Sequence, residues 1–185
     1  MKVLKFGGSS VGSKESILNL KGIVESQSDD VIVVVSALGG ITDRLINTAK
    51  LAAKGDKQYE EELSLMLKRH EQMIRDVIEV KRRRRANKHV RQLFDELSDI
   101  MHGLFLLHDL SDKTLDTIMS YGERLSTQIV VELIDEIKLF DARYFIKTEH
   151  KSPTHAIDSN LTYQLIQDTF KELPHRSLVP GFISS

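Results

Sequence analysis

The sequence predicts an α/β protein in which a mainly parallel sheet is covered by helices. Up to Ala53 the chain twice repeats the order strand, glycine-containing loop, helix, which is typical of a doubly wound α/β domain. The segment Val31–Val35 is an unbroken run of Val and Ile, which indicates a strand buried on both faces between helical layers. Residues 57–108 keep helical spacing, which predicts a helical hairpin inserted in the sheet domain or laid over it.

The first two strand–loop–helix units are short and well marked. Residues 3–6 form a strand that stops at Gly7-Gly8, and Ser13 is a suitable N-cap for the helix that follows. In the second unit Gly39-Gly40 ends the buried strand, and Thr42 can cap the next helix. The predicted inward faces are Ile17, Leu20 and Val24 in the first helix, and Leu45, Ile46, Ala49 and Ala53 in the second.

The second half of the chain contains longer helices and two further strands. After the hairpin, a long helix is predicted from about 122 to 138 and a strand at 142–146. A helix at 161–170 and a strand at 178–183 complete the pattern. An α/β unit would be expected to continue beyond that strand, so we expect a truncated domain.

Composition and charge exclude several classes of protein. A chain of 185 residues with 41% apolar and 29% charged residues is expected to form one globular domain. The net charge of −1 does not favour nucleic acid or an anionic membrane surface as a partner. The absence of cysteine excludes disulfides and thiolate metal sites. No signal-peptide core or membrane-spanning stretch is present, so we expect a cytoplasmic protein.

Seven basic residues lie within eleven positions at 81–91. A nucleic-acid patch is one interpretation, but no aromatic residues are interleaved and no nucleic-acid motif lies beside the run. We interpret the run as solvated helix surface. The alternative is that this basic surface contacts a partner subunit. The seven histidines are scattered without carboxylates at metal-ligand spacing, so no metal site is predicted, and His70 and His102 are assigned to helix faces.

The loop Lys5-Phe6-Gly7-Gly8-Ser9-Ser10 is the first candidate for chemistry. Glycines let the backbone approach a ligand closely, and consecutive N–H groups with two hydroxyls form an anion-binding concavity. Lys5 can place a positive charge on a phosphoryl group during transfer. The alternative is an ordinary turn with a solvated lysine. The loop is not a Walker motif, because the lysine precedes the glycines.

Two further segments contain candidate binding residues. The loop 36–42 follows the buried strand, and ligands of parallel sheets bind at the carboxyl ends of the strands. Thr42 could be a helix cap only, although a capping hydroxyl also lies beside an anion site. Glu123 stands at the predicted start of the long helix, where the helix dipole alone favours a glutamate. Its carboxylate could instead pair with the ammonium group of a small substrate.

Four segments in register resemble the aspartate kinase family. Lys5 to Gly12 is similar to the family's opening signature, usually written KFGGTS-V, with Ser9 where threonine is usual. The other three are Val34-Val35-Ser36-Ala37 followed by Gly40-Ile41-Thr42, Gly122-Glu123-Arg124-Leu125-Ser126, which resembles the GE-xx-S segment, and Pro180-Gly181-Phe182-Ile183, which resembles the GF-[IV] strand. The resemblance covers the whole chain, with the helical hairpin in place.

The resemblance implies the amino-acid kinase fold, a three-layer α/β/α sandwich with a mainly parallel sheet. It implies transfer of the γ-phosphoryl group of ATP, bound with Mg²⁺, to the side-chain carboxylate of L-aspartate, the first step towards lysine, threonine and methionine. Catalysis would rest on positioning and charge stabilisation, without a covalent enzyme intermediate. Lys5 would act on the transferring phosphoryl group, beside Gly7, Gly8 and Ser9; Ser36, Thr42, Glu123 and Phe182 would line the aspartate pocket, with Glu123 taking the α-ammonium group.

The same resemblance indicates what these 185 residues lack. A GRGGSD-type segment that supplies an arginine and an aspartate, the adenine- and ribose-binding part and paired ACT domains are not in the sequence. We therefore expect residues 1–185 to be the N-terminal portion of a catalytic domain, inactive alone, from an enzyme that is a homo-oligomer. Two alternatives stay open: a kinase of acetylglutamate or glutamate, and a non-catalytic interaction or oligomerisation module.

Overall fold

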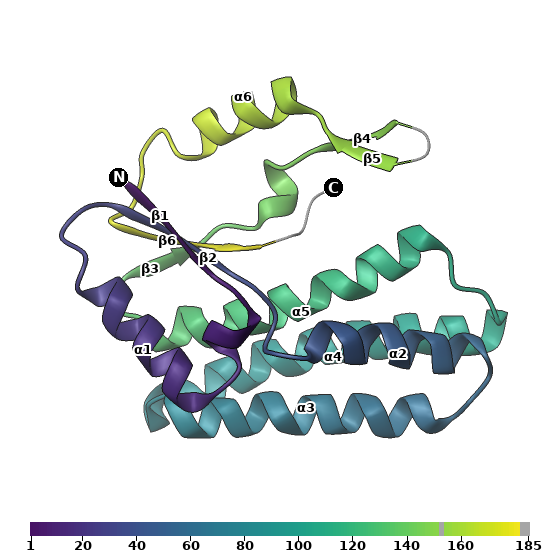
Figure 1. Cartoon of the computed structure of the whole chain (residues 1–185). Coiled ribbons are helices and arrows are strands. Elements are labelled where there is room, and N and C mark those ends of the chain that lie inside the picture. Colours follow the sequence, from purple (N-terminus) through teal and green to yellow (C-terminus); the bar gives the residue numbers. More distant parts are fainter. Residues whose placement is uncertain (152–153, 182–185) are drawn as a thin grey trace.

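The centre of the molecule is a parallel sheet in the order β1-β2-β6-β3 (Figure 1). The computed structural model describes residues 1–151 and 154–181. The strands of this sheet are β1 (Lys2–Phe6), β2 (Val31–Val35), β3 (Ile137–Leu139) and β6 (Arg176–Pro180). Phe6, Val35 and Pro180 lie at the same level in the register, so three strands end side by side. Two further strands, β4 (Thr148–Lys151) and β5 (Thr154–Ile157), form a separate antiparallel pair.

Helices cover both faces of the sheet, which confirms the predicted three-layer α/β/α arrangement (Figure 1). One face carries α6 (Ser159–Thr169) and the 3₁₀ turn η2 (Ala142–Tyr144), and the other carries α1 (Lys14–Glu25) and α5 (Asp112–Leu133). Val31, Val33 and Val35 are fully buried on the α1/α5 side, and Ile32 and Val34 pack into the smaller core beneath α6. Both faces of β2 are therefore covered, as its unbroken apolar run predicted.

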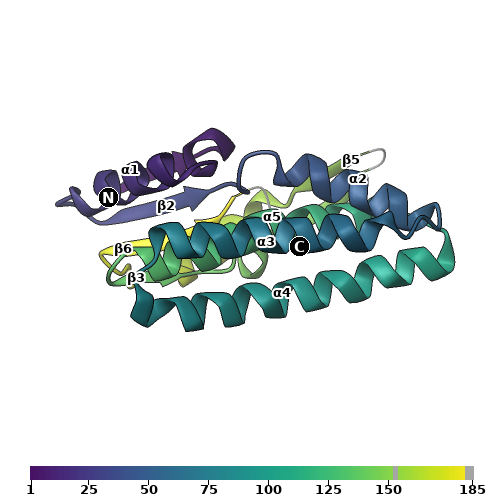
Figure 2. The same ribbon diagram turned by 90° about the horizontal axis from the view of Figure 1, so that it is seen from below.

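The predicted helical hairpin is present as α3 (Gln58–Val77) and α4 (Val80–Leu107). Together with α2 (Ile41–Ala53) and α5, these helices form a helical layer that extends beyond the sheet (Figure 2). Their inward faces join the larger of the two hydrophobic cores. In the described ranges 1–151 and 154–181, no helix is both long and apolar enough to span a membrane.

The basic run on α4 is a packing element rather than a uniformly solvated surface. Arg85 donates two hydrogen bonds to the buried carboxylate of Glu132 on α5, at 2.5 and 2.7 Å. Arg82 donates to the Glu132 carbonyl at 3.2 Å and pairs with Asp135. The solvated interpretation is thus wrong for Arg82, whose side chain is partly buried, and incomplete for Arg85, which is exposed but also pairs with Glu132. It holds for Arg84, which is exposed and has no recorded partner in the described part of the chain.

The boundaries of two elements near α5 were predicted wrongly. α5 begins at Asp112 with Ser111 as its N-cap, so Gly122 is in the middle of the helix and not at its start. Residues Ile137–Leu139 form a strand because they pair with β6, a tertiary contact that the local pattern does not contain. The predicted strand at 142–146 is instead a 3₁₀ turn, which the Asp141 carboxylate closes by accepting from the Arg143 N–H.

Candidate active site

The strands β1, β2 and β6 end side by side at the carboxyl edge of the sheet. The Ser36 N–H donates to the Phe6 carbonyl at 3.0 Å, and the Gly181 N–H donates to the Val35 carbonyl at 2.8 Å. These bonds continue the ladder one residue past the strands. The loops that follow β1 and β2 therefore begin next to each other, as expected for a ligand site of an open parallel sheet.

Glycines bring the first and second loops into backbone contact. A Cβ on Gly12 would lie 3.0 Å from the Gly8 carbonyl oxygen, and one on Gly39 would lie 3.1 Å from the same atom. Gly7 is different, because a Cβ there would meet no atom within 4 Å and its φ of −76° suits any residue. Neither packing nor conformation requires glycine at Gly7. The space beside it is open for a ligand.

The polar residues of the first loop are accessible. Lys5 is exposed near the end of β1, and in the ranges 1–151 and 154–181 no hydrogen bond or ion pair engages its ammonium group. Ser9 is exposed in the 3₁₀ turn η1 (Gly8–Val11), which begins where Gly7 accepts from the Ser10 N–H. The predicted phosphate-binding residues thus lie within five consecutive positions at the end of β1 and in the loop after it, with Lys5 and Ser9 exposed.

Glu123 is the buried carboxylate of the site. Its side chain projects from the middle of α5, so the expected first-turn position is wrong and the helix dipole does not explain it. The residue is 5% exposed, and its Oε1 accepts from the Ala37 N–H at 3.3 Å and from the Ser36 hydroxyl at 3.5 Å. Burial raises the pKa of Glu123 and these hydrogen bonds oppose the shift. In the part of the chain that the structure describes, no other residue is recorded as donating to its Oε2.

Gly122 and Ser126 belong to the segment that resembles the GE-xx-S motif, but no site role was predicted for either of them. The hydroxyl of Ser126 is fully buried and donates to the Ser36 carbonyl at 2.7 Å. A Cβ on Gly122 would lie 2.7 Å from the Cβ of Ala37, so the glycine lets the second loop approach α5. Positions 122, 123 and 126 are neighbours on one helix face, and this spacing is the signal that could have identified them.

Thr42 and Phe182 were the remaining predicted site residues. α2 begins at Ile41, because Gly40 at φ +76° is the N-cap, two residues before the predicted cap at Thr42. Thr42 is therefore a half-buried residue of the first turn, and the prediction that it caps the helix is wrong. Its role in a pocket stays a prediction. Phe182 lies outside the described residues, so its predicted place is untested.

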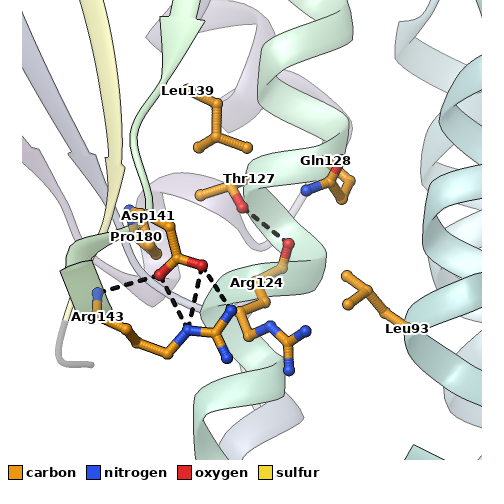
Figure 3. A pocket seen from close by; sticks show the side chains of 8 residues that line it. All are labelled: Leu93, Arg124, Thr127, Gln128, Leu139, Asp141, Arg143 and Pro180. Carbon is orange, nitrogen blue, oxygen red and sulfur yellow. Dashed lines mark hydrogen bonds and ion pairs between the residues drawn. The ribbon is translucent and has the colours of Figure 1, made fainter. Parts of the chain in front are cut away.

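A small pocket of about 120 Å³ lies along a neighbouring face of α5 (Figure 3). Each of its charged side chains already has a partner of opposite charge. Arg143 donates to both carboxylate oxygens of Asp141, and Arg124 donates to Glu96 at 3.0 Å. Burial acts to raise the pKa of Asp141, but the Arg143 hydrogen bonds outweigh it and the pKa is lowered. Within the described residues, the sheet edge has an ammonium group without a recorded partner and a carboxylate with donors to one oxygen, so it is the stronger candidate site.

The arrangement defines a doubly wound α/β domain with glycine loops and charged side chains at the carboxyl edge of its parallel sheet. More particularly, the chain belongs to the amino acid kinase family, whose model matches residues 1–184. No group of three or more histidine or acidic residues that could hold a metal ion occurs within residues 1–151 and 154–181.

The chain is similar to curated aspartokinases. It is 31% identical over 139 residues to the bifunctional aspartokinase/homoserine dehydrogenase of Buchnera aphidicola, which is 72% of this chain and 17% of that protein. It is 30% identical over 141 residues to the aspartokinase of Candida albicans, covering 72% of this chain and 26% of that protein. The chain thus spans only a minor part of the relatives it matches.

The fold is similar to that of E. coli aspartokinase III. The structure of that enzyme in complex with lysine and aspartate matches all of this chain and 41% of its own, with a TM-score of 0.83 at 23% identity. Its structure in complex with aspartate and ADP matches with a TM-score of 0.81. Together with the family match, these comparisons confirm the resemblance that the four sequence segments predicted.

Proposed function

We propose that the chain forms the L-aspartate pocket and the phosphate-binding loop of an aspartate kinase. Such an enzyme transfers the γ-phosphoryl group of ATP to the side-chain carboxylate of L-aspartate. The observation that carries the proposal is the placing of Glu123, Ser36 and the open Gly7 loop at one edge of the sheet. The aspartokinases of B. aphidicola and C. albicans, and E. coli aspartokinase III in complex with aspartate and ADP, support it.

On the aspartate side, Glu123 binds the α-ammonium group. A buried carboxylate needs compensation for its charge, and Ser36 and Ala37 donate to one oxygen only. The substrate's ammonium group would pair with Oε2 and complete this compensation. Ser36 and Thr42 would contribute hydroxyls to the same pocket, and Phe182 would form part of its wall.

On the phosphate side, the first loop binds the transferring group. Gly7, Gly8 and Ser9 offer open space, backbone N–H groups and a hydroxyl, and Lys5 offers a positive charge with no competing partner in the described residues. A carboxylate oxygen of aspartate forms a bond to the γ-phosphorus while the bond from phosphorus to the β–γ bridging oxygen breaks, which releases ADP. Mg²⁺, carried by the nucleotide phosphates, supplies further charge neutralisation when bound.

The product of the proposed reaction indicates a role in amino-acid biosynthesis. The product, 4-phospho-L-aspartate, would enter lysine, threonine and methionine biosynthesis in the cytoplasm, and the full enzyme would be a homo-oligomer. We propose that these 185 residues bind aspartate without turning over ATP, because the arginine and aspartate that the resemblance assigns to the substrate site are not among them. The test therefore measures binding.

Calorimetric titration with L-aspartate and with succinate, which lacks the ammonium group, tests the assignment of Glu123. L-Aspartate should bind more tightly than succinate, and Glu123→Gln should weaken aspartate binding by roughly tenfold or more, because a charge-assisted hydrogen bond is lost. Succinate binding should change little. Glu61→Gln, at an exposed position on α3, is the matched control and should change neither. Equal binding of both ligands by the unmodified protein would contradict the proposal.

A further inference from the structure

We infer that Ser126 is a positioning residue, which together with Glu123 holds one peptide group of the second loop in place. The inference rests on the proposed function, because the peptide group that is held belongs to the proposed aspartate pocket. Ser126 itself would not touch the substrate. It would act through Ser36 and through the carboxylate of Glu123.

The two hydrogen bonds reach both polar groups of a single peptide unit. The hydroxyl of Ser126 donates to the Ser36 carbonyl at 2.7 Å, and the Ala37 N–H donates to Glu123 Oε1 at 3.3 Å. That carbonyl and that N–H lie in the same rigid plane. Glu123 and Ser126 are three residues apart and share one face of α5. One helix face therefore fixes the orientation of the whole Ser36–Ala37 peptide.

The second loop needs such a restraint because of the residues that follow. Gly39 and Gly40 follow Leu38, and Gly40 adopts φ +76°; glycine residues by themselves restrict the backbone less than other residues do. Apart from Ser126, no other described residue is recorded as donating to the Ser36 carbonyl. A rotation of this peptide would move the Ala37 N–H away from Glu123. The same rotation would change the position of the Ser36 hydroxyl relative to Glu123.

A simpler explanation is that Ser126 only bonds to its own helix. Its hydroxyl also lies 3.0 Å from the Glu123 carbonyl, three residues earlier in α5. Ser120, on the same helix, makes this kind of bond alone, donating to the Thr117 carbonyl at 2.6 Å. Ser120→Ala is therefore the matched control. It removes the same hydroxyl from the same helix without reaching the second loop.

The test compares Ser126→Ala, Ser120→Ala and the unmodified chain by amide hydrogen exchange and by NMR titration with L-aspartate. Alanine is the best helix former, so α5 should persist in both variants, and far-UV circular dichroism checks this. In Ser126→Ala, exchange at the Ala37 amide should accelerate by about tenfold, and the Kd for L-aspartate should rise about fivefold to tenfold, because one buried hydrogen bond is lost. Exchange in β2 should not change, and Ser120→Ala should change neither quantity.

The outcomes separate this inference from the proposed function. Unchanged Ala37 exchange in Ser126→Ala overturns the inference, whatever happens to aspartate binding. Equal effects of the two variants overturn it as well. If the unmodified chain binds no L-aspartate, the proposed function fails, but Ala37 exchange still decides whether Ser126 holds the peptide.

Discussion

Two buried ionisable side chains, Glu123 and His70, show how position decides the role of a titratable group. Glu123 lies at the end of the sheet, where two donors reach one of its oxygens and no other described residue is recorded as donating to the second. His70 is fully buried between α3 and α4, where its Nδ1 donates to the Met66 carbonyl at 2.7 Å and its ring meets the edge of Phe94. No described residue is recorded as bonding His70 Nε2, so only the neutral ring suits this place.

His70 should make the stability of the protein depend on pH. Burial, more than any other cause, lowers its pKa from 6.5 to about 4. Between these pH values the unfolded chain binds up to one more proton than the folded chain. The contribution of His70 to the free energy of unfolding is therefore fully present above pH 6.5 and is lost as the pH falls towards 4. The loss from this residue should reach roughly 3 kcal/mol, at about 1.4 kcal/mol per pKa unit. Urea unfolding at a series of pH values measures it.

A variant separates His70 from the carboxylates that also titrate in this range. His70→Gln should be less stable at neutral pH, but its free energy of unfolding should fall less steeply between pH 6.5 and 4.5. His102→Gln, at an exposed histidine, should keep the steep dependence. Parallel curves for the unmodified protein and His70→Gln would show that the buried ring does not titrate as expected.

At the scale of the element, α5 connects the helical layer to the site. Its central face packs against the second loop through Gly122, Glu123 and Ser126. Its C-terminal part is held to α4 by Arg85, which bonds a Glu132 side chain that is only 3% exposed. A substitution at either contact should therefore change the stability of the protein by an amount that the helix propensities of the two residues do not predict.

Gly122 and Gly103 should respond to alanine in opposite ways. Both lie inside helices, where alanine is better than glycine by about 0.5–1 kcal/mol. A Cβ on Gly103 meets nothing within 4 Å, so Gly103→Ala should stabilise the protein by about that amount. A Cβ on Gly122 would lie 2.7 Å from that of Ala37, so Gly122→Ala should destabilise it by about 1–3 kcal/mol. Equal stabilisation by both, in urea unfolding, would refute the close packing.

Arg85 and Arg84 form a second matched pair, in the basic run of α4. Arg85→Met removes both donors from the buried carboxylate of Glu132 and should lower the urea midpoint. Arg84→Met, at an exposed neighbour with no recorded partner in the described part of the chain, should leave the midpoint nearly unchanged. Similar urea midpoints for the two variants would show that the contact between Arg85 and Glu132 does not stabilise the protein, as expected for a solvated surface.

Across the whole molecule, the helices and strands predicted correctly are those that a local sequence pattern defines. The strand Val31–Val35 and the hairpin helices were found because a continuous apolar run and helical spacing extend over many residues. The start of α5 was misplaced at Gly122, ten residues after its true first residue Asp112. Here the glycine makes room for Ala37, a contact between segments far apart in the chain. β3 was missed for the same reason, since its pairing partner is β6.

In the candidate site too, residues in local motifs were predicted and long-range contacts were not. Lys5, Gly7 and Glu123 were identified from motifs, and the structure places them at the edge that a parallel sheet offers to ligands. The contact of Ser126 could not be predicted, because its partner is a backbone carbonyl 90 positions away. Likewise, nothing local in the basic run indicates that Arg85 bonds a residue of α5.

We propose that the carboxyl edge of the sheet binds both L-aspartate and the phosphates of ATP. Amide chemical-shift mapping of the isotope-labelled chain, titrated with each ligand in turn, tests it most directly. L-Aspartate should shift the amides of Ser36, Ala37 and Glu123, and ATP with Mg²⁺ should shift those of Gly7, Gly8 and Ser9. Shifts confined to the pocket beside Arg124 and Arg143, or no shifts with either ligand, would contradict the account.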